Sequence, residues 1–367
     1  MCHSEEMEMT SKQVPVTSSA VPAKSSAYAA AGVDIDSKMT GIADIKKLVA
    51  TTKTSGVLGG IGSFGGLFRS PGAGMVLVAS TDGVGTKLKV ASMAKRHTTV
   101  GQDIVNHCVN DILVQGAKPL FFLDYIGASR FDGQVFQDVV WGICKACKEN
   151  GCALLGGETA EMPGLYPIGE YDLVGTIVGV VEKKKLITGS SIRAGDLIIG
   201  LPSGGLQTNG FSLARRVIFD RLGLTPQDLI PGTRMTVADS LLAVHRSFLK
   251  PVKALMDRKV PIRGMAHITG GGFVDNIPRV LPKTCDAVIN RFSWIPPTIF
   301  NLIENQGKVD RDEMYRVFNM GIGFVIILRK NDAATAMTIL KRLNQAPVII
   351  GRIKKGTGKV SYEDIKQ

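Results

Sequence analysis

Apolar positions in the first half of the chain alternate between short β-type runs and longer stretches with helical spacing. Runs rich in apolar and β-branched residues predict strands at 75–80, 120–126, 152–155 and 173–182. Stretches in which apolar residues recur every three or four positions predict helices at 86–97, 99–115 and 133–150. Strands that alternate with helices in this way favour an α/β domain.

The composition changes after this first series. Residues 182–196 are first charged and then bear Gly and Ser, which is typical of a connector between domains. A second series of strands is predicted at 197–201, 287–291, 322–328 and 347–353. Helices are predicted near 210–222, 237–258, 297–306, 311–318 and 331–344. We therefore expect a disordered tail over 1–24, an N-terminal domain over 25–190 and a C-terminal domain over 191–367.

Charge and composition narrow the class of partner. The 367 residues carry a net charge of +12, which suits anionic partners. Aromatic residues make up 6% of the chain and do not interleave with the scattered basic residues, so bases would find no stacking platform. We expect a small phosphorylated substrate and no nucleic acid. No apolar run approaches the roughly 18 residues of a membrane span, and the N-terminal residues lack the features of a signal peptide, so we expect a cytoplasmic protein without membrane contact.

A glycine-rich string, GGIGSFGG, spans residues 59–66. Gly60, Gly62 and Gly65 give it a formal GxGxxG match, but a helix is predicted before it, whereas a dinucleotide fingerprint requires a strand there. Glycines let backbone N–H groups approach an anion closely, so this loop is a candidate for capping the phosphates of a nucleotide. A structural turn is the alternative.

The string STDGVGTK, residues 80–87, directly follows an apolar strand. The strand end places Asp82 and Gly83 at the carboxyl edge of a sheet, where α/β proteins bind ligands. Asp82 is a candidate ligand of Mg²⁺, and Lys87 is a candidate for neutralising a phosphate. Thr86 is placed to cap the next helix or to donate to a ligand oxygen. A plain turn at Asp82 and Gly83 is the alternative.

Three titratable residues recur at helical spacing in the next segment. Asp103, His107 and Asp111 stand at i, i+4 and i+8 and therefore share one helix face. Two carboxylates on one face repel each other mildly, and a divalent cation would remove that penalty. Oxygen ligands favour magnesium, although zinc would also accept His107. An ordinary polar helix face is the alternative.

Further candidates lie in loops that follow predicted strands. The string GGETAEMPG carries Glu158 and Glu161 in what we expect to be a Gly/Pro-constrained loop, where an acid binds metal or accepts a proton. In the second half, two strings run into predicted helices and offer anion sites at helix N-termini. Their candidate substrate-binding residues are Ser203, Gly204, Gly205 and Asn209 in one string, and Gly270, Gly271 and Gly272 in the other.

Taken together, these strings resemble the phosphoribosylformylglycinamidine cyclo-ligases, or aminoimidazole ribonucleotide synthetases, of the PurM-like ATP-binding group. The resemblance runs from about residue 28 to about residue 353 and includes GGIGSFGG, STDGVGTK, CVNDILVQGAKPLFFLDY, GGETAEMPG, NGFSLARR, HITGGGFVDNIPRVLP and MYRVFNMGIG in order. It implies a mixed α/β (α+β) two-domain fold. The sheet of the first domain would pair with its copy in a homodimer, and the second domain would hold a mixed sheet flanked by helices.

The resemblance also implies an activity and residue roles. ATP and Mg²⁺ would drive ring closure of formylglycinamidine ribonucleotide to aminoimidazole ribonucleotide. Carried over by position, Lys46 matches a lysine near the ATP phosphates, and His267 matches a substrate contact or proton carrier. The implied residues on the metal and nucleotide side are Asp82, Lys87, Asp103, Asn110, Asp111 and Glu158.

One position departs from the family pattern. The family usually has a histidine in a GxHxNG string, where this chain has Gln207 within LQTNG. Glutamine does not titrate near neutral pH, so an obligatory acid or base at this position would lose roughly 10²–10⁴ in rate. Because the other motifs are intact, we expect a working enzyme in which Gln207 binds substrate. The alternatives are another ATP-dependent kinase or transferase of the same group, or a nucleotide-binding regulatory protein with little turnover.

Overall fold

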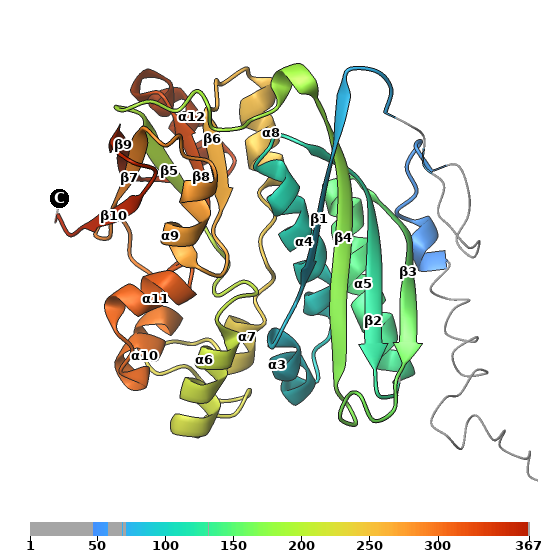
Figure 1. Cartoon of the computed structure of the whole chain (residues 1–367). Coiled ribbons are helices and arrows are strands. Elements are labelled where there is room, and N and C mark those ends of the chain that lie inside the picture. The colour runs from blue at the N-terminus through green and yellow to red at the C-terminus, as the bar shows by residue number, and fades with distance from the viewer. Residues whose placement is uncertain (1–46, 58–67, 69–70, 131, 366–367) are drawn as a thin grey trace, which may run out of the picture.

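The computed structural model describes residues 47–57, 68, 71–130 and 132–365 of the chain, and two layered α/β halves lie side by side within it (Figure 1). Lys46, Gly60, Gly62, Gly65 and the tail over residues 1–24 lie outside the described residues. Within the described part, no helix is long and apolar enough to cross a membrane.

The first half is built on a four-stranded sheet in the order β1-β4-β2-β3. The strands are β1 (Met75–Gly83), β2 (Lys118–Ala128), β3 (Ala153–Glu161) and β4 (Tyr171–Glu182). β4 pairs antiparallel with β1 and β2, and β2 pairs parallel with β3. This half also contains α3 (Lys87–Ala94), α4 (Thr98–Leu113) and α5 (Gly133–Asn150).

Helices α4 and α5 cover one face of this sheet because alternate strand residues are apolar and point at them. In β4, Leu173, Ile177 and Val181 are buried on this face. The two helices touch backbone to backbone at Gly101 and Gly142. A Cβ at Gly101 would lie 2.0 Å from the carbonyl oxygen of Val139, so no larger residue fits this crossing.

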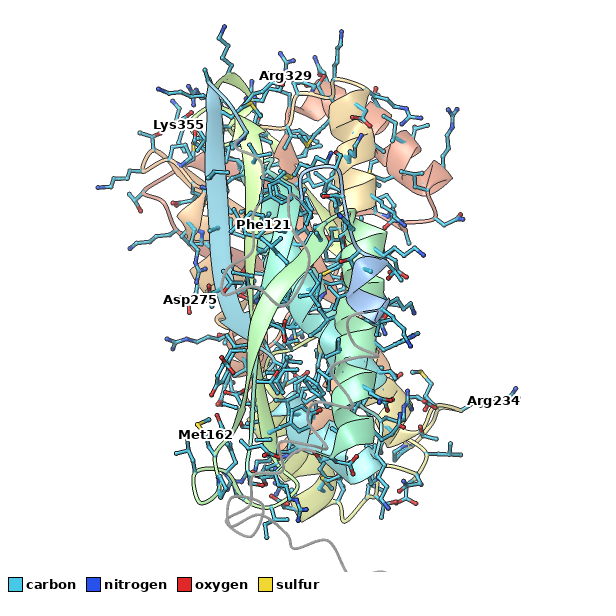
Figure 2. The ribbon with its side chains drawn as sticks, turned by 90° about the vertical axis from the view of Figure 1, so that its right-hand side faces the viewer. Phe121, Met162, Arg234, Asp275, Arg329 and Lys355 are labelled. Carbon is cyan, nitrogen blue, oxygen red and sulfur yellow. The ribbon has the colours of Figure 1, made fainter. Side chains whose placement is uncertain are left out.

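Helices α4 and α5 do not cover the opposite face of the sheet, and Phe121, which belongs to that face, is labelled in Figure 2. Residues that pair across β1, β4 and β2 point outward together, as the registers Leu77↔Val180 and Val178↔Phe121 require. Leu77 is 56% exposed. The outer face of this sheet, as defined here, consists of Leu77, Ala79, Thr81, Phe121, Leu123, Tyr125, Val174, Thr176, Val178 and Val180.

The second half is built on a six-stranded mixed sheet in the order β10-β7-β9-β5-β8-β6. The strands are β5 (Leu197–Pro202), β6 (Gly264–His267), β7 (Cys285–Asn290), β8 (Ile322–Leu328), β9 (Val348–Lys355) and β10 (Val360–Glu363). Its helices are α6 (Phe211–Arg215), α7 (Val237–Leu241), α8 (Leu249–Asp257), α9 (Gly272–Asn276), α10 (Thr298–Gly307), α11 (Arg311–Val317) and α12 (Lys330–Arg342). Every residue of β8 is buried, which places this strand at the centre of the core.

The structure confirms the strands and helices predicted for the first half, and it corrects three local predictions. β3 continues to Glu161, so Glu158 and Glu161 lie in a strand and not in a loop, because backbone pairing with β2 extends through them. The helix expected over 237–258 is broken into α7 and α8, and residues 242–248 between them are irregular. The Gly-rich segment between 258 and 287 contains β6 and α9, which hydrophobic periodicity alone did not reveal.

Candidate active site at the domain interface

Helix α4 lies between the first sheet and the second half of the molecule (Figure 1). The shared face expected for Asp103, His107 and Asp111 forms on this helix and is directed at the second half. Their partners there are the backbone of His245 for Asp103, Thr208 for His107 and His267 for Asp111. The side chains of Asp103 and His107 are 0% and 4% exposed, whereas that of Asp111 is 26% exposed. The helix face is therefore an interface, and only its Asp111 end reaches solvent.

Polar side chains of α4 hold the irregular segment 242–248 in place. Asp103 accepts a hydrogen bond from the backbone N–H of His245 at 2.6 Å. Asn106 donates to the carbonyl oxygen of His245 at 2.8 Å. Asn110 accepts from the N–H of Phe248 at 2.9 Å and donates to the carbonyl oxygen of Arg246 at 2.8 Å. These bonds satisfy backbone groups that a continuous helix would have paired internally. Pro251, in the first turn of α8, also disfavours a helix that continues back towards α7.

Lys87 forms an ion pair inside this interface. Its Nζ lies 2.7 Å from Oδ2 of Asp103, and both side chains are 0% exposed. Nζ also donates to the carbonyl oxygen of Ala243 at 2.8 Å. Burial lowers the pKa of Lys87, and the charge of Asp103 only partly offsets this effect. Burial likewise raises the pKa of Asp103, although Lys87 acts in the opposite direction. In this structure the ammonium therefore binds within the protein, and a phosphate contact by Lys87 stays a prediction.

Asp82 and Asp111 come together around His107. Nε2 of His107 lies 2.8 Å from Oδ2 of Asp82 and 3.8 Å from Oδ2 of Asp111, which also accepts from Ser80 at 3.0 Å. Burial alone would lower the pKa of His107, but its hydrogen bond to Asp82 and the charges of both carboxylates raise it. Burial would raise the pKa of each carboxyl, yet hydrogen bonds from the imidazoles hold the pKa of Asp82 and of Asp111 below the ordinary value.

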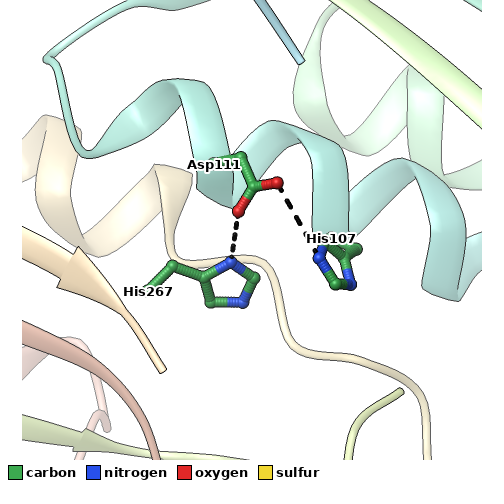
Figure 3. A group of neighbouring side chains, drawn as sticks. All are labelled: His107, Asp111 and His267. Carbon is green, nitrogen blue, oxygen red and sulfur yellow. Dashed lines mark hydrogen bonds and ion pairs between the residues drawn. The ribbon is translucent and has the colours of Figure 1, made fainter. Parts of the chain in front are cut away.

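His267 projects from the end of β6 towards Asp111, and Figure 3 shows the pair with His107. Its Nδ1 lies 2.8 Å from Oδ1 of Asp111, and its Nε2 lies 3.0 Å from Nε2 of His245. Burial lowers the pKa of His267 and, more strongly, that of His245. His107, Asp111 and His267 offer ligand atoms within 4.8 Å of one another, so they form a candidate metal group. Both ring nitrogens of His267 already have partners, which favours the carboxylates as cation ligands.

Gln207 is buried beside this cluster without joining it. Its residue is 2% exposed, its φ is +64°, and neither its Oε1 nor its Nε2 has a hydrogen-bond partner. The neighbouring Thr208 does join: its Oγ1 lies 2.8 Å from Nδ1 of His107 and 3.3 Å from Nδ1 of His245. The side-chain amide of Gln207 is thus an unsatisfied polar group next to the site.

The two glycine-bearing strings of the second half meet near Asn209. A Cβ at Gly270 would lie 3.1 Å from Oδ1 of Asn209, and the amide Nδ2 of Asn209 is buried without a partner. Asn276 holds the loop by donating to the carbonyl oxygens of Gly270 and Gly272. Gly272 has a φ of +57°, and a Cβ there would lie 1.9 Å from a backbone oxygen, so only glycine fits.

Gly83 and Thr86 follow Asp82 in the chain, whereas Glu158 lies on β3, at the edge of the first sheet opposite β1. Gly83 donates its N–H to Asp82. Thr86 stands at the N-cap position before α3, but its side chain makes no capping hydrogen bond, and its Oγ1 lies 3.2 Å from Oγ of Ser212. Glu158 is exposed and accepts from the N–H of the next residue. Ser203 donates to the carbonyl oxygen of Gly205 and anchors the start of the LQTNG string.

A cavity of about 330 Å³ opens beside Asp111 and His267. Ser80 lines it from the first half, and Asn276 and Arg279 line it from the second. The cavity therefore combines one carboxylate, that of Asp111, with the guanidinium of Arg279 and with side-chain amides. Such a set can bind an anionic substrate together with a divalent cation.

Sequence reasoning missed His245 and Thr208, which complete the cluster. His245 occurs in a stretch with helical apolar spacing and belongs to no motif, so only the break between α7 and α8 exposes its role. Thr208 stands one residue after Gln207, within the LQTNG string. Its hydroxyl could have been named as a candidate site group, because it adjoins the one position that departs from the family pattern.

Comparisons with known proteins match both halves of the chain to one family. Residues 64–181 match the family described as AIR synthase related protein, N-terminal domain, and residues 193–363 match the corresponding C-terminal domain. The chain is 48% identical over 331 residues to the phosphoribosylformylglycinamidine cyclo-ligase of Geotalea uraniireducens, covering 89% of this chain and 95% of the relative. It is 49% identical to the corresponding protein of a Thermoanaerobacter species, covering 91% and 99%.

Solved structures support the fold. A hydrogenase maturation protein in complex with ATP superimposes with a TM-score of 0.65 at 19% identity, covering 89% of this chain and 91% of that one. A thiamine-monophosphate kinase from Stenotrophomonas maltophilia superimposes with a TM-score of 0.63 at 18% identity, covering 89% and 97%. The two-domain PurM-like α/β architecture expected from the sequence is confirmed.

Proposed function

We propose a reaction and residue roles from the premise that this chain belongs to the phosphoribosylformylglycinamidine cyclo-ligase family. The chain is an ATP-dependent ligase that closes formylglycinamidine ribonucleotide to 5-aminoimidazole ribonucleotide, releasing ADP and phosphate, in purine biosynthesis. The observation that carries this conclusion is identity of about one half over about nine tenths of the chain. The meeting of motifs from both halves at Asp111 and His267 supports it.

The proposed chemistry needs orientation and charge neutralisation. The formyl oxygen attacks the γ-phosphorus of ATP and ADP leaves, which converts that oxygen into part of a phosphate leaving group. A nitrogen of the substrate then attacks the activated carbon, the ring closes, and phosphate and a proton leave. Enzymes accelerate such transfers mainly by positioning the reactants and stabilising the developing charge.

Asp82 and Asp111 fit the Mg²⁺ that ATP carries. Their side chains are 43% and 26% exposed, so a ligand can approach both carboxylates from solvent. Their lowered pKa values keep both carboxylates ionised at neutral pH. When bound, Mg²⁺ would neutralise phosphate charge. The role proposed for Asp82 and Asp111 is to hold this cation, with the cavity beside Arg279 receiving the anionic substrate.

The proposal includes a homodimer formed through the outer face of the first sheet. This face is apolar apart from two threonines and a tyrosine hydroxyl, and contiguous apolar faces of this kind are typical of interfaces. The change Leu77→Glu would place a charge at the face, and Leu229→Glu is a matched control because Leu229, 57% exposed, lies in the second half. Sedimentation equilibrium should give a dimer for the native and control proteins and a monomer for Leu77→Glu. A native protein that is monomeric at micromolar concentration would contradict the proposed homodimer.

The proposed setting is the cytoplasm. The five cysteines in the described part are buried free thiols, as expected in a reducing compartment.

The decisive experiment follows both products. Purified protein is mixed with Mg²⁺, ATP and formylglycinamidine ribonucleotide, and ADP and aminoimidazole ribonucleotide are measured together. We expect equal amounts of both, and loss of both in Asp111→Asn. Asp257→Asn is the matched control, because Asp257 is an exposed acid whose partner is Lys253 on the same helix. ATP binding without imidazole product would favour the regulatory alternative, and turnover stimulated instead by thiamine phosphate or selenide would favour another transferase of the group.

A further inference from the structure

A chain of hydrogen bonds crosses the domain interface and includes three of the five histidines of the sequence. It runs from Asp82 to His107 at 2.8 Å and from His107 to Thr208 at 2.8 Å. From Thr208 it continues to His245 at 3.3 Å, to His267 at 3.0 Å and finally to Asp111 at 2.8 Å. We call this series the histidine circuit.

The direction of each bond in the circuit follows from its two ends. A carboxylate only accepts, so Nδ1 of His267 must carry the hydrogen that it donates to Asp111. A neutral His267 then has a lone pair on Nε2, and Nε2 of His245 must donate to it. The remaining nitrogen of neutral His245, Nδ1, accepts from the hydroxyl of Thr208. Both residues are buried, and the 3.0 Å contact between their Nε2 atoms requires one of these two nitrogens to accept.

His245 is held rigidly enough to orient its neighbour. The residue is 0% exposed. Its backbone N–H and carbonyl bond to Asp103 and Asn106 of α4, so both the main chain and the ring are fixed. Three imidazole rings pack at centroid distances of 5.0–5.1 Å, which leaves little room for His267 to turn.

We propose that His245 is a positioning residue that fixes the tautomer and orientation of His267, and through it the Asp111 carboxylate at the catalytic cation site. This inference rests on the proposed function for its catalytic consequence. Because both nitrogens of His267 are engaged inside the protein, His267 orients Asp111 and does not exchange a proton with substrate. The circuit is complete without a titratable group at position 207, so it predicts that the enzyme tolerates Gln207.

A kinetic test uses two substitutions at His245. His245→Leu removes both hydrogen bonds of the ring, and His245→Gln retains an N–H that can donate to His267. Loss of a group that orients a metal ligand typically lowers metal affinity or activity about 10–100-fold. We expect His245→Leu to lower kcat at least about tenfold and to raise the Mg²⁺ concentration for half-maximal rate, with KM for the ribonucleotide changed less than about threefold. His245→Gln should recover most of the loss, and the control His97→Gln should leave these values unchanged.

A second test requires no activity and separates the two proposals. The protein is labelled with ¹⁵N-histidine, and each imidazole is assigned from His→Gln variants. We expect His267 as the Nδ1–H tautomer with a hydrogen-bonded Nε2, and a non-bonded Nε2 in His245→Leu. Finding the Nε2–H tautomer of His267 in the native protein would overturn the positioning role. If the protein shows the expected tautomer of His267 but no ligase activity, the circuit is supported and only the proposed function is refuted. If His245→Gln and His245→Leu have equal kinetics, the hydrogen-bond argument is refuted.

Discussion

The buried ion pair between Lys87 and Asp103 makes a quantitative prediction about the domain interface. The change Asp103→Ala would leave the ammonium of Lys87, which is 0% exposed, with a single neutral acceptor at Ala243. It would also leave the N–H of His245 without its 2.6 Å acceptor. An uncompensated buried charge costs about 3–5 kcal/mol, and an orphaned buried N–H costs about 1–3 kcal/mol.

Relaxation of the interface and entry of water offset part of these costs, so we expect a net loss of about 4 kcal/mol, a large share of the roughly 5–15 kcal/mol typical of a folded domain. The loss should shrink as the pH rises towards about 9. Without Asp103, burial lowers the pKa of Lys87 still further, and the folded state then binds fewer protons than the unfolded state, whose lysine keeps a pKa near 10.5.

The measurement is urea unfolding followed by tryptophan fluorescence. The chain has two tryptophans, Trp141 in the first half and Trp294 in the second, so Trp141→Phe and Trp294→Phe backgrounds report each half separately. The control is the double variant Lys87→Met/Asp103→Leu, which removes both charges and fills similar volume. Replacing a buried pair in this way is often neutral or stabilising, so it should fall within about 1–2 kcal/mol of the native protein. A loss below about 1 kcal/mol in Asp103→Ala, or equal losses in the single and double variants, would refute the reasoning.

Three further predictions follow from the site. Gly272→Ala should cost at least about 2 kcal/mol in urea unfolding, because a Cβ there meets a backbone oxygen at 1.9 Å; Gly151→Ala, with a similar φ and open space, should cost about 1 kcal/mol. His107→Gln, measured without Mg²⁺, should lose more stability at about pH 6 than at about pH 9. The pKa of His107 is raised by Asp82, so its contribution is present below 6.5 and disappears as the pH rises through the folded pKa; an equal loss at both pH values would contradict this. Gln207→His should change kcat by less than tenfold, and a much larger gain would mean that the native residue impairs the chemistry.

Local sequence patterns were sufficient for most elements and for the family. The continuous apolar run of β8 predicts a buried strand, because every one of its side chains is buried. The spaced apolar positions of α5 predict a helix, because only one stripe of its side chains is buried. Spacing alone also placed Asp103, His107 and Asp111 on one face of a helix. These are properties of neighbours in sequence, which short-range geometry determines.

Tertiary structure decided what those side chains contact. The apolar spacing of residues 237–258 is helical, although Pro251 within it disfavours a continuous helix and lies in the first turn of α8. Asp103, Asn106 and Asn110 hold the segment before α8 in its irregular conformation by hydrogen bonding to backbone groups about 140 positions away. For the same reason Lys87, expected at a phosphate, forms an ion pair within the interface.

The sequence by itself therefore determined the two domains, the order of the motifs and the family to which the chain belongs. Only the tertiary structure decided that His245, outside every motif, closes a chain of hydrogen bonds between His107 of one half and His267 of the other. The physical reason is that a buried polar group must find its partner wherever the fold brings one within about 3 Å, and that distance bears no relation to separation along the chain.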